Sequence, residues 1–266
     1  MNISKSVYYY KSIKDDSPVI EKLIELTRKH TKRGCDKLYD QIRQEGLIWN
    51  YKRVRRVYVA LKLNLKRQVK KRLPARVKQP IIIPDSINGC WSMDFMSDAL
   101  CNGRKIRILN ILDDYNREIL AIETSTSIPS VSVVRTLEEI ISWRGKPQKI
   151  RVDNGPEFTS LIFADWCKEN GIEIQYIQPG KPVQNALIER FNRTFRGEVL
   201  DAYIFEDLNQ VRGIAQEWME DYNEERPHES LGSLSPNKFK ALALLVDSGK
   251  LEKSFPQSTR NYNSNN

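Results

Sequence analysis

The stretch that decides the fold is QKIRVDNGPEFTSLIFADWCKENGIEIQYIQPGKPVQNALIERFNRTFR, which runs from Gln148 to Arg196. It contains two acids, Asp153 and Glu189, that are separated by 35 residues. A third acid, Asp94, lies upstream in the segment WSMDFMSD. We predict that these three carboxylates come together as one metal-binding cluster.

The residues around Asp153 predict its place in a sheet. The run 149–152, KIRV, is rich in β-branched residues and is typical of a short buried strand. The four residues that follow, DNGP, favour a turn. We therefore expect Asp153 at the carboxyl end of a strand, where open α/β sheets bind their ligands.

The residues around Glu189 predict a helix from Val183 to about Leu200. Its apolar stripe recurs every four residues, at Leu187, Phe191 and Phe195. Glu189 falls about opposite this stripe and is free to face another element. A turn aspartate or a helix glutamate alone is usually a solvated surface residue, so the prediction rests on the combination.

The composition limits the function classes. The formal net charge is +9 and the sequence pI is about 9.3, which indicates an anionic partner. No apolar run approaches the ~20 residues that cross a membrane, and the first residues lack the apolar core of a signal peptide. We therefore expect a cytoplasmic protein with no membrane partner. Four scattered cysteines and two histidines show no zinc-binding spacing and are expected to be reduced packing residues.

Residues 1–62 are predicted to form a helix-turn-helix-like domain of three short helices, over about 17–30, 35–45 and 51–62. The third helix begins with a basic cluster, which makes it a candidate for DNA contact. The cluster consists of Lys52, Arg53, Arg55 and Arg56. The alternative is a small helical bundle with a solvated basic face.

Residues 63–84 are predicted to be a basic linker that follows DNA phosphates. Its strongest run, VKKRLPAR, contributes Lys70, Lys71 and Arg72 as candidate contacts. A nuclear address is the generic alternative for such a run, and nothing else in the sequence supports one.

Residues 85–245 are predicted to form the core, an α/β domain. Strands are expected over 91–95, 104–112, 118–123, 149–152 and 173–177, with helices over 130–145, 160–170 and 183–200 and further helices towards the end. This order predicts a ribonuclease H-like fold, a five-stranded mixed sheet with flanking helices and Asp94 on its central strand. Asp113 and Asp114 are assigned to a hairpin turn. The polar tail, 246–266, is expected to be disordered.

Five ordered motifs carry a family resemblance: WSMDFMSD, LDDYNREILAIE, RVDNGPEF, IQPGKPVQNALIERFNRTFR and YNEERPHESLGSLSP. Together they resemble the integrase-type catalytic core of bacterial insertion-sequence transposases, and more narrowly the second reading frame of the insertion-sequence-three family. The basic segments WNYKRVRRVY and KKRLPAR are similar to the helix-turn-helix part of such proteins. The resemblance covers nearly the whole chain.

The resemblance implies a DDE transposase, named for its three catalytic acids, here Asp94, Asp153 and Glu189. Arg196 matches the basic position that follows the glutamate in that family. Implied partners are double-stranded DNA at transposon ends and targets, further copies of the chain on that DNA, and the product of an upstream reading frame, separate or fused. The implied location is the bacterial cytoplasm, at the nucleoid. Unlike retroviral integrases, the chain shows no N-terminal His/Cys zinc domain.

The three acids suit two Mg²⁺ (or Mn²⁺) ions about 3.5–4 Å apart, because hard cations prefer carboxylate oxygens. At such a site water would cut a transposon end, and the freed 3′-hydroxyl would attack another phosphodiester. Candidate phosphate contacts beside the triad are Lys181, Arg190, Arg193 and Arg196, with surface solvation as the alternative.

Two other function classes stay open on the same residues. One is a ribonuclease H-like nuclease that cleaves without joining. The other is an inactive, DNA-binding remnant of a mobile element. Joined DNA products would exclude the first, and dependence on metal would exclude the second.

Overall fold

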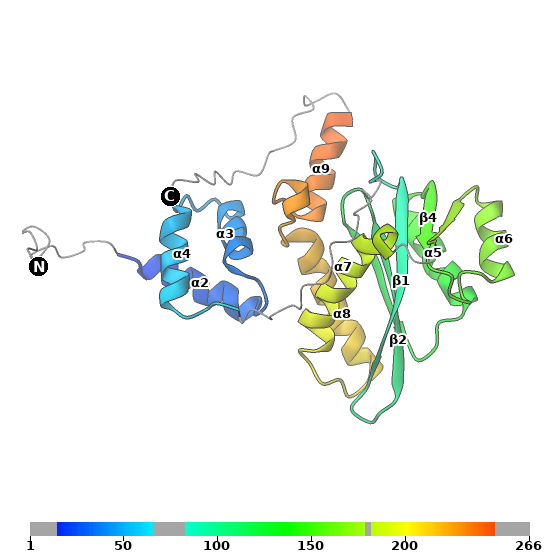
Figure 1. Cartoon of the computed structure of the whole chain (residues 1–266), viewed down its shortest axis with the longest axis horizontal. Coiled ribbons are helices and arrows are strands. Elements are labelled where there is room, and N and C mark those ends of the chain that lie inside the picture. The colour runs from blue at the N-terminus through cyan, green and yellow to red at the C-terminus, as the bar shows by residue number, and fades with distance from the viewer. Residues whose placement is uncertain (1–14, 66–82, 179–181, 248–266) are drawn as a thin grey trace, which may run out of the picture. The chain divides into compact units, whose positions relative to one another are not determined.

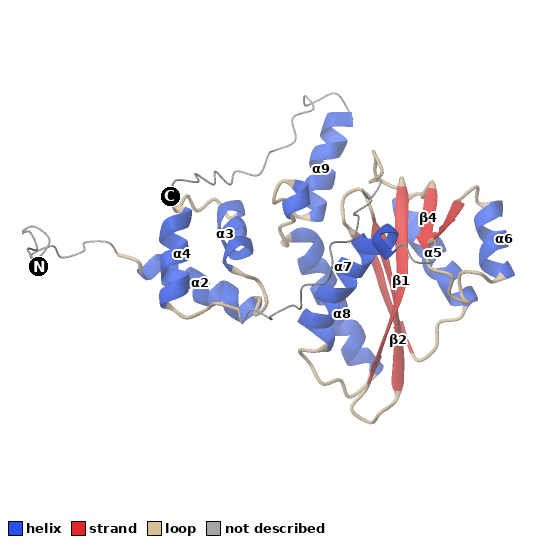
Figure 2. Ribbon diagram, viewed as in Figure 1, coloured by secondary structure: helices blue, strands red, loops and turns tan. Residues whose placement is uncertain are grey.

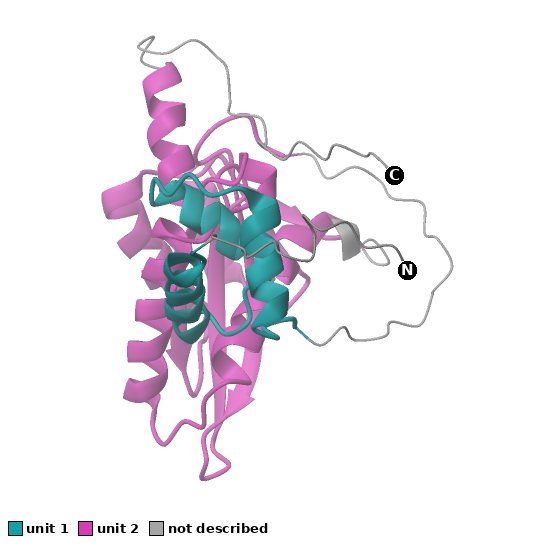
Figure 3. Cartoon of the chain, turned by 90° about the vertical axis from the view of Figure 1, so that its left-hand side faces the viewer, with its two compact units in different colours: residues 1–70 teal, residues 71–266 magenta. Residues whose placement is uncertain are grey.

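The computed structural model describes residues 15–65, 83–178 and 182–247 (Figure 1). The chain divides into two compact units, residues 1–70 and residues 71–266 (Figure 3). The boundaries of the four predicted segments remain predictions. These segments are 1–62, 63–84, 85–245 and 246–266.

Unit 1 contains three helices: α2 (Ser17–Lys29), α3 (Cys35–Gln44) and α4 (Tyr51–Ala60). Their apolar faces meet in one small core that includes Val19, Leu23, Leu38, Ile42 and Val54. Asn50 caps α4, since its side chain accepts a hydrogen bond of 2.8 Å from the Lys52 N–H. The three-helix arrangement expected from the hydrophobic spacing is present, and α4 ends two residues earlier than expected.

Unit 2 is built on a five-stranded sheet, coloured red in Figure 2. The strands are β1 (Cys90–Ala99), β2 (Lys105–Asp113), β3 (Ile119–Ser125), β4 (Lys149–Val152) and β5 (Glu173–Tyr176). Their order in the sheet is β3-β2-β1-β4-β5. The first three strands pair antiparallel, whereas β4 pairs parallel with β1 and β5 pairs parallel with β4. The mixed sheet with a central first strand is thus confirmed.

Helices cover both faces of this sheet, because alternate residues of β1 and β2 point to opposite sides. One core, with Trp91, Met93, Leu109 and Ile111 from the strands, packs against α5 (Ser130–Arg144) and α6 (Leu161–Glu169). The other core, with Met96, Ile106 and Ile108, packs against α7 (Ala186–Phe195) and α8 (Leu208–Glu224). Helix α9 (Pro236–Asp247) follows and packs on α8.

The single helix expected over 183–200 is instead three segments: a 3₁₀ turn (Pro182–Asn185), α7, and a π-helical turn (Arg196–Leu200). In the π turn the Asp201 N–H donates to the Arg196 carbonyl at 2.8 Å. This wider turn brings two adjacent residues, Val199 and Leu200, into the core behind Phe195. A simple four-residue apolar spacing does not reveal such a change of period.

Within the described ranges no helix combines the length and the hydropathy that crossing a bilayer demands.

Candidate active site

Two of the three acids lie side by side at one edge of the sheet. The parallel pairing of β1 and β4 sets Ser92 opposite Arg151, and continuing that register by two residues sets Asp94 level with Asp153. Since β4 ends at Val152, Asp153 follows it at the carboxyl edge of the sheet. Neighbouring strands are only about 4.8 Å apart, so the two carboxylates belong to one site.

The loop after β4 holds the Asp153 carboxylate in place. The Gly155 N–H donates to Asp153 Oδ1 at 2.9 Å. A side chain at position 155 would put its Cβ 2.9 Å from that same oxygen, which only glycine avoids. Further along the loop, Ser130 Oγ donates to the Glu157 carbonyl and Tyr176 OH to the Phe158 carbonyl, both at 2.9 Å. The loop is therefore anchored to α5 and to β5.

The Asp94 carboxylate is partly buried and held at both oxygens. Its Oδ1 accepts the N–H of Phe95 at 2.9 Å, and its Oδ2 accepts the side-chain amide of Asn192 at 2.7 Å. Asn192 lies on α7 and in turn accepts a hydrogen bond of 2.7 Å from the amide of Asn110. Asn110 is the β2 residue paired with Asp94.

Glu189 approaches the two aspartates from α7. It lies in the first turn of this helix, three residues before Asn192, and is exposed. Residues three apart share one helix face, so the bond between Asn192 and Asp94 turns this face towards β1. Burial, helped by the negative charges of Asp153 and Glu189, raises the pKa of Asp94 to about 6 against the hydrogen bonds that lower it. Both acids are therefore close enough to Asp94 for their charges to act on its carboxylate.

The donor set fits hard divalent cations. All three groups offer carboxylate oxygens, which Mg²⁺ prefers. Within residues 15–65, 83–178 and 182–247, no lysine or arginine forms an ion pair with Asp94, Asp153 or Glu189. The ligand oxygens of these acids do not all lie within 4.8 Å of one another.

The cations predicted beside the triad have different surroundings. Arg196 donates to the Ser97 carbonyl at 2.7 Å and pairs with Asp98 at 3.4 Å, so it ties the end of α7 to β1. Arg190 and Arg193 are exposed on α7. Lys181 lies outside the described residues. DNA contact by each of them stays a prediction.

The basic residues of unit 1 surround the start of α4, where a hollow is lined by Asp15, Asn50, Lys52, Arg53 and Arg56. Arg53 and Arg56 pair with Asp16 at 2.9 and 2.6 Å, and Arg55 lies 3.5 Å from the hydroxyl of Tyr51. The predicted linker contacts Lys70, Lys71 and Arg72 lie outside the described residues. The predicted DNA contacts of this unit therefore remain to be tested.

Sequence reasoning missed a buried ion-pair network near the start of β1. Asp113 pairs with Arg144 at 3.2 Å and Asp114 with Arg151 at 2.6 Å, and both aspartates are fully buried. The turn assignment accounts only for the 3.0 Å bond from the Tyr115 N–H to Asp113. Burial raises the pKa of both aspartates against the arginine charges that lower it. These acids are neutralised within the protein.

Sequence reasoning also missed Asn110 and Asn192. Two signals could have pointed to them. Asn110 interrupts the apolar run ILNIL of β2, and Asn192 follows Glu189 by three residues on one face of α7.

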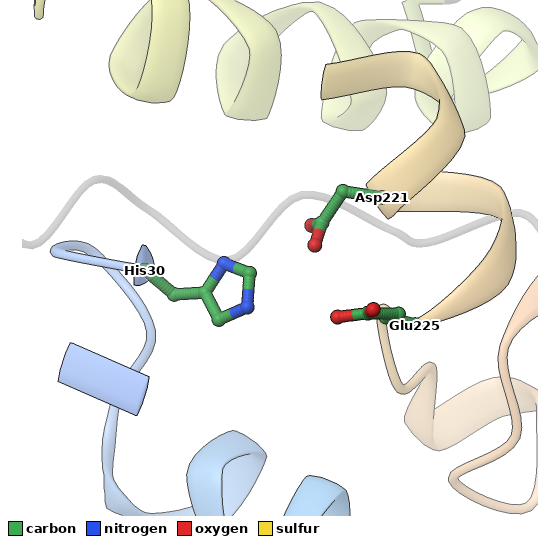
Figure 4. Close-up of side chains that lie close together, drawn as sticks. All are labelled: His30, Asp221 and Glu225. Carbon is green, nitrogen blue, oxygen red and sulfur yellow. The ribbon is translucent and has the colours of Figure 1, made fainter. Parts of the chain in front are cut away.

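Two further acids, Asp221 and Glu225, lie one turn apart at the end of α8, and Figure 4 shows their side chains on the same side of that helix. His30, drawn in the same view, belongs to unit 1.

Two family models, both described as "Integrase core domain", match residues 84–182 and 170–236. Together they span the sheet, all three acids and α7. In fold, the chain is similar to a chain of the simian T-cell lymphotropic virus intasome in complex with PP2A regulatory subunit B56 gamma. That likeness covers 81% of this chain and 73% of that one, at a TM-score of 0.51 and 16% identity. The ribonuclease H-like core predicted from the order of the elements is thus confirmed.

Proteins of bacterial insertion elements are similar over most of the chain. An uncharacterized 31.7 kDa protein of insertion element IS407 from Burkholderia multivorans is 36% identical over 91% of this chain and 88% of its own. A 39.2 kDa protein of IS476 from Xanthomonas euvesicatoria is 40% identical over 83% of this chain, which spans 64% of that relative's length.

A putative transposase of insertion sequence element IS150 from Escherichia coli is 23% identical over 90% of both chains. The IS407 relative, matched over most of both lengths, is likewise a protein of an insertion element, and the family models add the integrase core. The chain therefore belongs to the insertion-element transposases that carry an integrase core domain.

Proposed function

We propose that this protein cuts DNA at the ends of an insertion sequence and joins the freed ends to new phosphodiesters by a DDE mechanism. Asp94, Asp153 and Glu189 are the catalytic acids and the ligands of two Mg²⁺ or Mn²⁺ ions. The motif order further supports a place in the insertion-sequence-three family, as the product of its second reading frame.

The observation that carries this proposal is the convergence of the acids from three elements. Asp94 on β1 is level with Asp153, which directly follows the adjacent parallel strand β4, and α7 carries Glu189 to them. No cation of the described residues neutralises any of the three. Carboxylates that are close together and unneutralised repel one another, and a bound divalent cation is the usual reason for such an arrangement.

When bound at these carboxylates, divalent ions would activate an attacking oxygen and neutralise the charge that develops at the phosphate. Asp94 offers oxygens whose orientation is fixed by two hydrogen bonds. Asp153 and Glu189 are exposed, so ions held by their carboxylates would be open to a phosphate of the substrate. Water cleaves one phosphodiester and leaves a 3′-hydroxyl, which then displaces another 3′-oxygen, so each joining step breaks one P–O bond and forms one.

Double-stranded DNA is the proposed partner, at element ends and at the target. The net charge of +9 and the exposed cations of α4 and α7 support this. The chain of similar fold belongs to an intasome, which supports the proposal that several copies act together on DNA. A product of an upstream reading frame, separate or fused, is the second proposed partner. Because its proposed substrate is the bacterial chromosome, the proposed location of the protein is the nucleoid in the bacterial cytoplasm.

The experiment is a strand-transfer assay on an oligonucleotide that carries the element's end, with Mg²⁺, comparing wild type, Asp153→Asn and Asp165→Asn. Asp165 is an exposed acid of α6 and serves as the matched control. We expect Asp153→Asn to lose both cleavage and joining and Asp165→Asn to keep both. Joining by Asp153→Asn at the wild-type rate would refute the proposal. Cleavage without joined products by wild type would support the nuclease alternative.

A further inference from the structure

We infer that Asn192 is a positioning residue that fixes the carboxylate of Asp94 for metal binding, and that Asn110 acts through Asn192 in the same task. This inference rests on the proposed function of the triad. It concerns neither a ligand nor a group that touches DNA, but a side-chain relay that runs from β2 through α7 to β1.

The chemistry of the groups sets the direction of the relay. A carboxylate only accepts hydrogen bonds, so Asn192 presents its NH₂ to Asp94 Oδ2, at 2.7 Å. The carbonyl oxygen of Asn192 then points the other way and needs a donor. Asn110 supplies one, since its own NH₂ lies 2.7 Å from that oxygen. Without Asn110, the Asn192 amide could turn over and face Asp94 with an oxygen.

Asn110 itself has no evident packing reason to be polar. It is fully buried, it lies in an apolar stretch of β2, and its Oδ1 is left without a hydrogen bond within the described ranges. A buried polar atom without a partner destabilises a fold by about 1–3 kcal/mol. The hydrogen bond that the Asn110 side chain donates to Asn192 gives a reason for a polar residue at this buried position.

The relay also sets the spacing between two acids. Asn192 follows Glu189 by three residues on one face of α7, so its bond to Asp94 fixes the distance of that face from β1. One turn further on, Arg196 binds the Ser97 carbonyl at 2.7 Å and holds the same face to the same strand. Groups that orient metal ligands in this way typically change metal affinity about 10–100-fold when they are removed.

The test compares full-length wild type, Asn192→Ala, Asn110→Leu and the double variant, with Asn209→Ala on the exposed surface of α8 as control. The readouts are Mn²⁺ affinity by calorimetry, the Mg²⁺ concentration that gives half-maximal strand transfer, and the melting temperature without metal. We expect Asn192→Ala to weaken Mn²⁺ binding and raise the Mg²⁺ requirement about 10–100-fold. Asn209→Ala leaves both unchanged.

Asn110→Leu gives the sharper signature. It removes a buried polar group and adds apolar volume, so we expect an unchanged or higher melting temperature together with weaker Mn²⁺ binding. The double variant should bind Mn²⁺ no more weakly than Asn192→Ala, because Asn110 acts only through Asn192. Should Asn110→Leu fail to fold, Asn110→Ala, which also lacks a side-chain donor, replaces it in the same cycle.

The outcomes separate this inference from the proposed function. If Asn192→Ala binds Mn²⁺ as tightly as wild type while Asp153→Asn has lost binding and activity, the relay is wrong and the triad stands. Additive losses of affinity in the double variant would also overturn it. If Asp153→Asn itself stays active, the proposed function has failed, whatever Asn192 does.

Discussion

Two groups of acids lie at the same sheet, and they differ in whether a cation of the protein pairs with them. Near the start of β1, Asp113 and Asp114 are fully buried, and each faces an arginine. At the carboxyl edge of β4, Asp94, Asp153 and Glu189 converge with no such partner among the described residues. The first group has its counter-charges within the protein, whereas we propose that the second takes a cation from outside. The presence or absence of a paired arginine thus distinguishes the structural acids from the proposed metal ligands.

Removal of one cation from the neutralised group should have the largest effect on stability. Arg144→Met leaves Asp113 and Glu118 buried without this partner, since Arg144 lies 3.2 and 2.7 Å from them. We expect a loss of about 3–5 kcal/mol in the free energy of unfolding, measured by urea denaturation. Arg135→Met, on the exposed side of the same helix, should cost less than about 0.5 kcal/mol. Equal losses would contradict the contrast.

Replacing an acid of the second group with a neutral residue should instead increase the free energy of unfolding of the metal-free protein. The pKa of Asp94 is raised from 3.8 to about 6, so its charged form destabilises the metal-free folded protein above pH 6. This destabilisation disappears as the pH falls through 6 towards 3.8, where the group is protonated in both states. We expect Asp94→Asn to stabilise the metal-free protein by about 1–3 kcal/mol at pH 8. The gain should shrink as the pH falls from 6 towards 3.8, and a gain that is independent of pH would contradict this cause.

Mg²⁺ should offset the destabilisation that the charged form of Asp94 causes in the wild-type protein. Binding to the folded state alone stabilises by about 1.4 kcal/mol when the free ion is ten times its Kd. We therefore expect Mg²⁺ to raise the melting temperature of wild type and of Asp165→Asn, but not of Asp94→Asn. A rise in Asp94→Asn equal to that of wild type would place the ion elsewhere.

The smallest expected effect on stability concerns Arg196. This residue has an ion pair within the protein and is also a candidate phosphate contact. Asp98→Asn breaks a partly exposed ion pair of 3.4 Å and should change stability by less than about 1 kcal/mol. If Arg196 also contacts a phosphate, Arg196→Ala should lower the salt dependence of DNA binding by about one ion, whereas Asp98→Asn should not. An unchanged salt dependence in Arg196→Ala would leave Arg196 only its bond to β1.

The sequence predicts the elements of the core well, because their signals are local. The run before Asp153 is rich in β-branched residues, the turn DNGP ends it, and Gly145 and Gly171 follow their helices. The alternation of strands and helices then leaves few topologies, which is why the central place of β1 could be predicted.

The pairings that tell the two groups of acids apart could not be predicted, because they join distant residues. Arg144 is 31 residues from Asp113, and Asn192 is 98 residues from Asp94. Which of these meet depends on how each helix is rotated on the sheet. The π turn after α7 adds a change of helical period that no apolar spacing shows.

The most direct measurement is the anomalous diffraction of Mn²⁺ in crystals of the protein. We expect density for Mn²⁺ between Asp94 and Asp153, with Glu189 within reach of the same density, and no density beside Asp113 or Asp114. Density at the arginine-paired acids, or none at the triad when Mn²⁺ supports strand transfer in solution, would contradict the account.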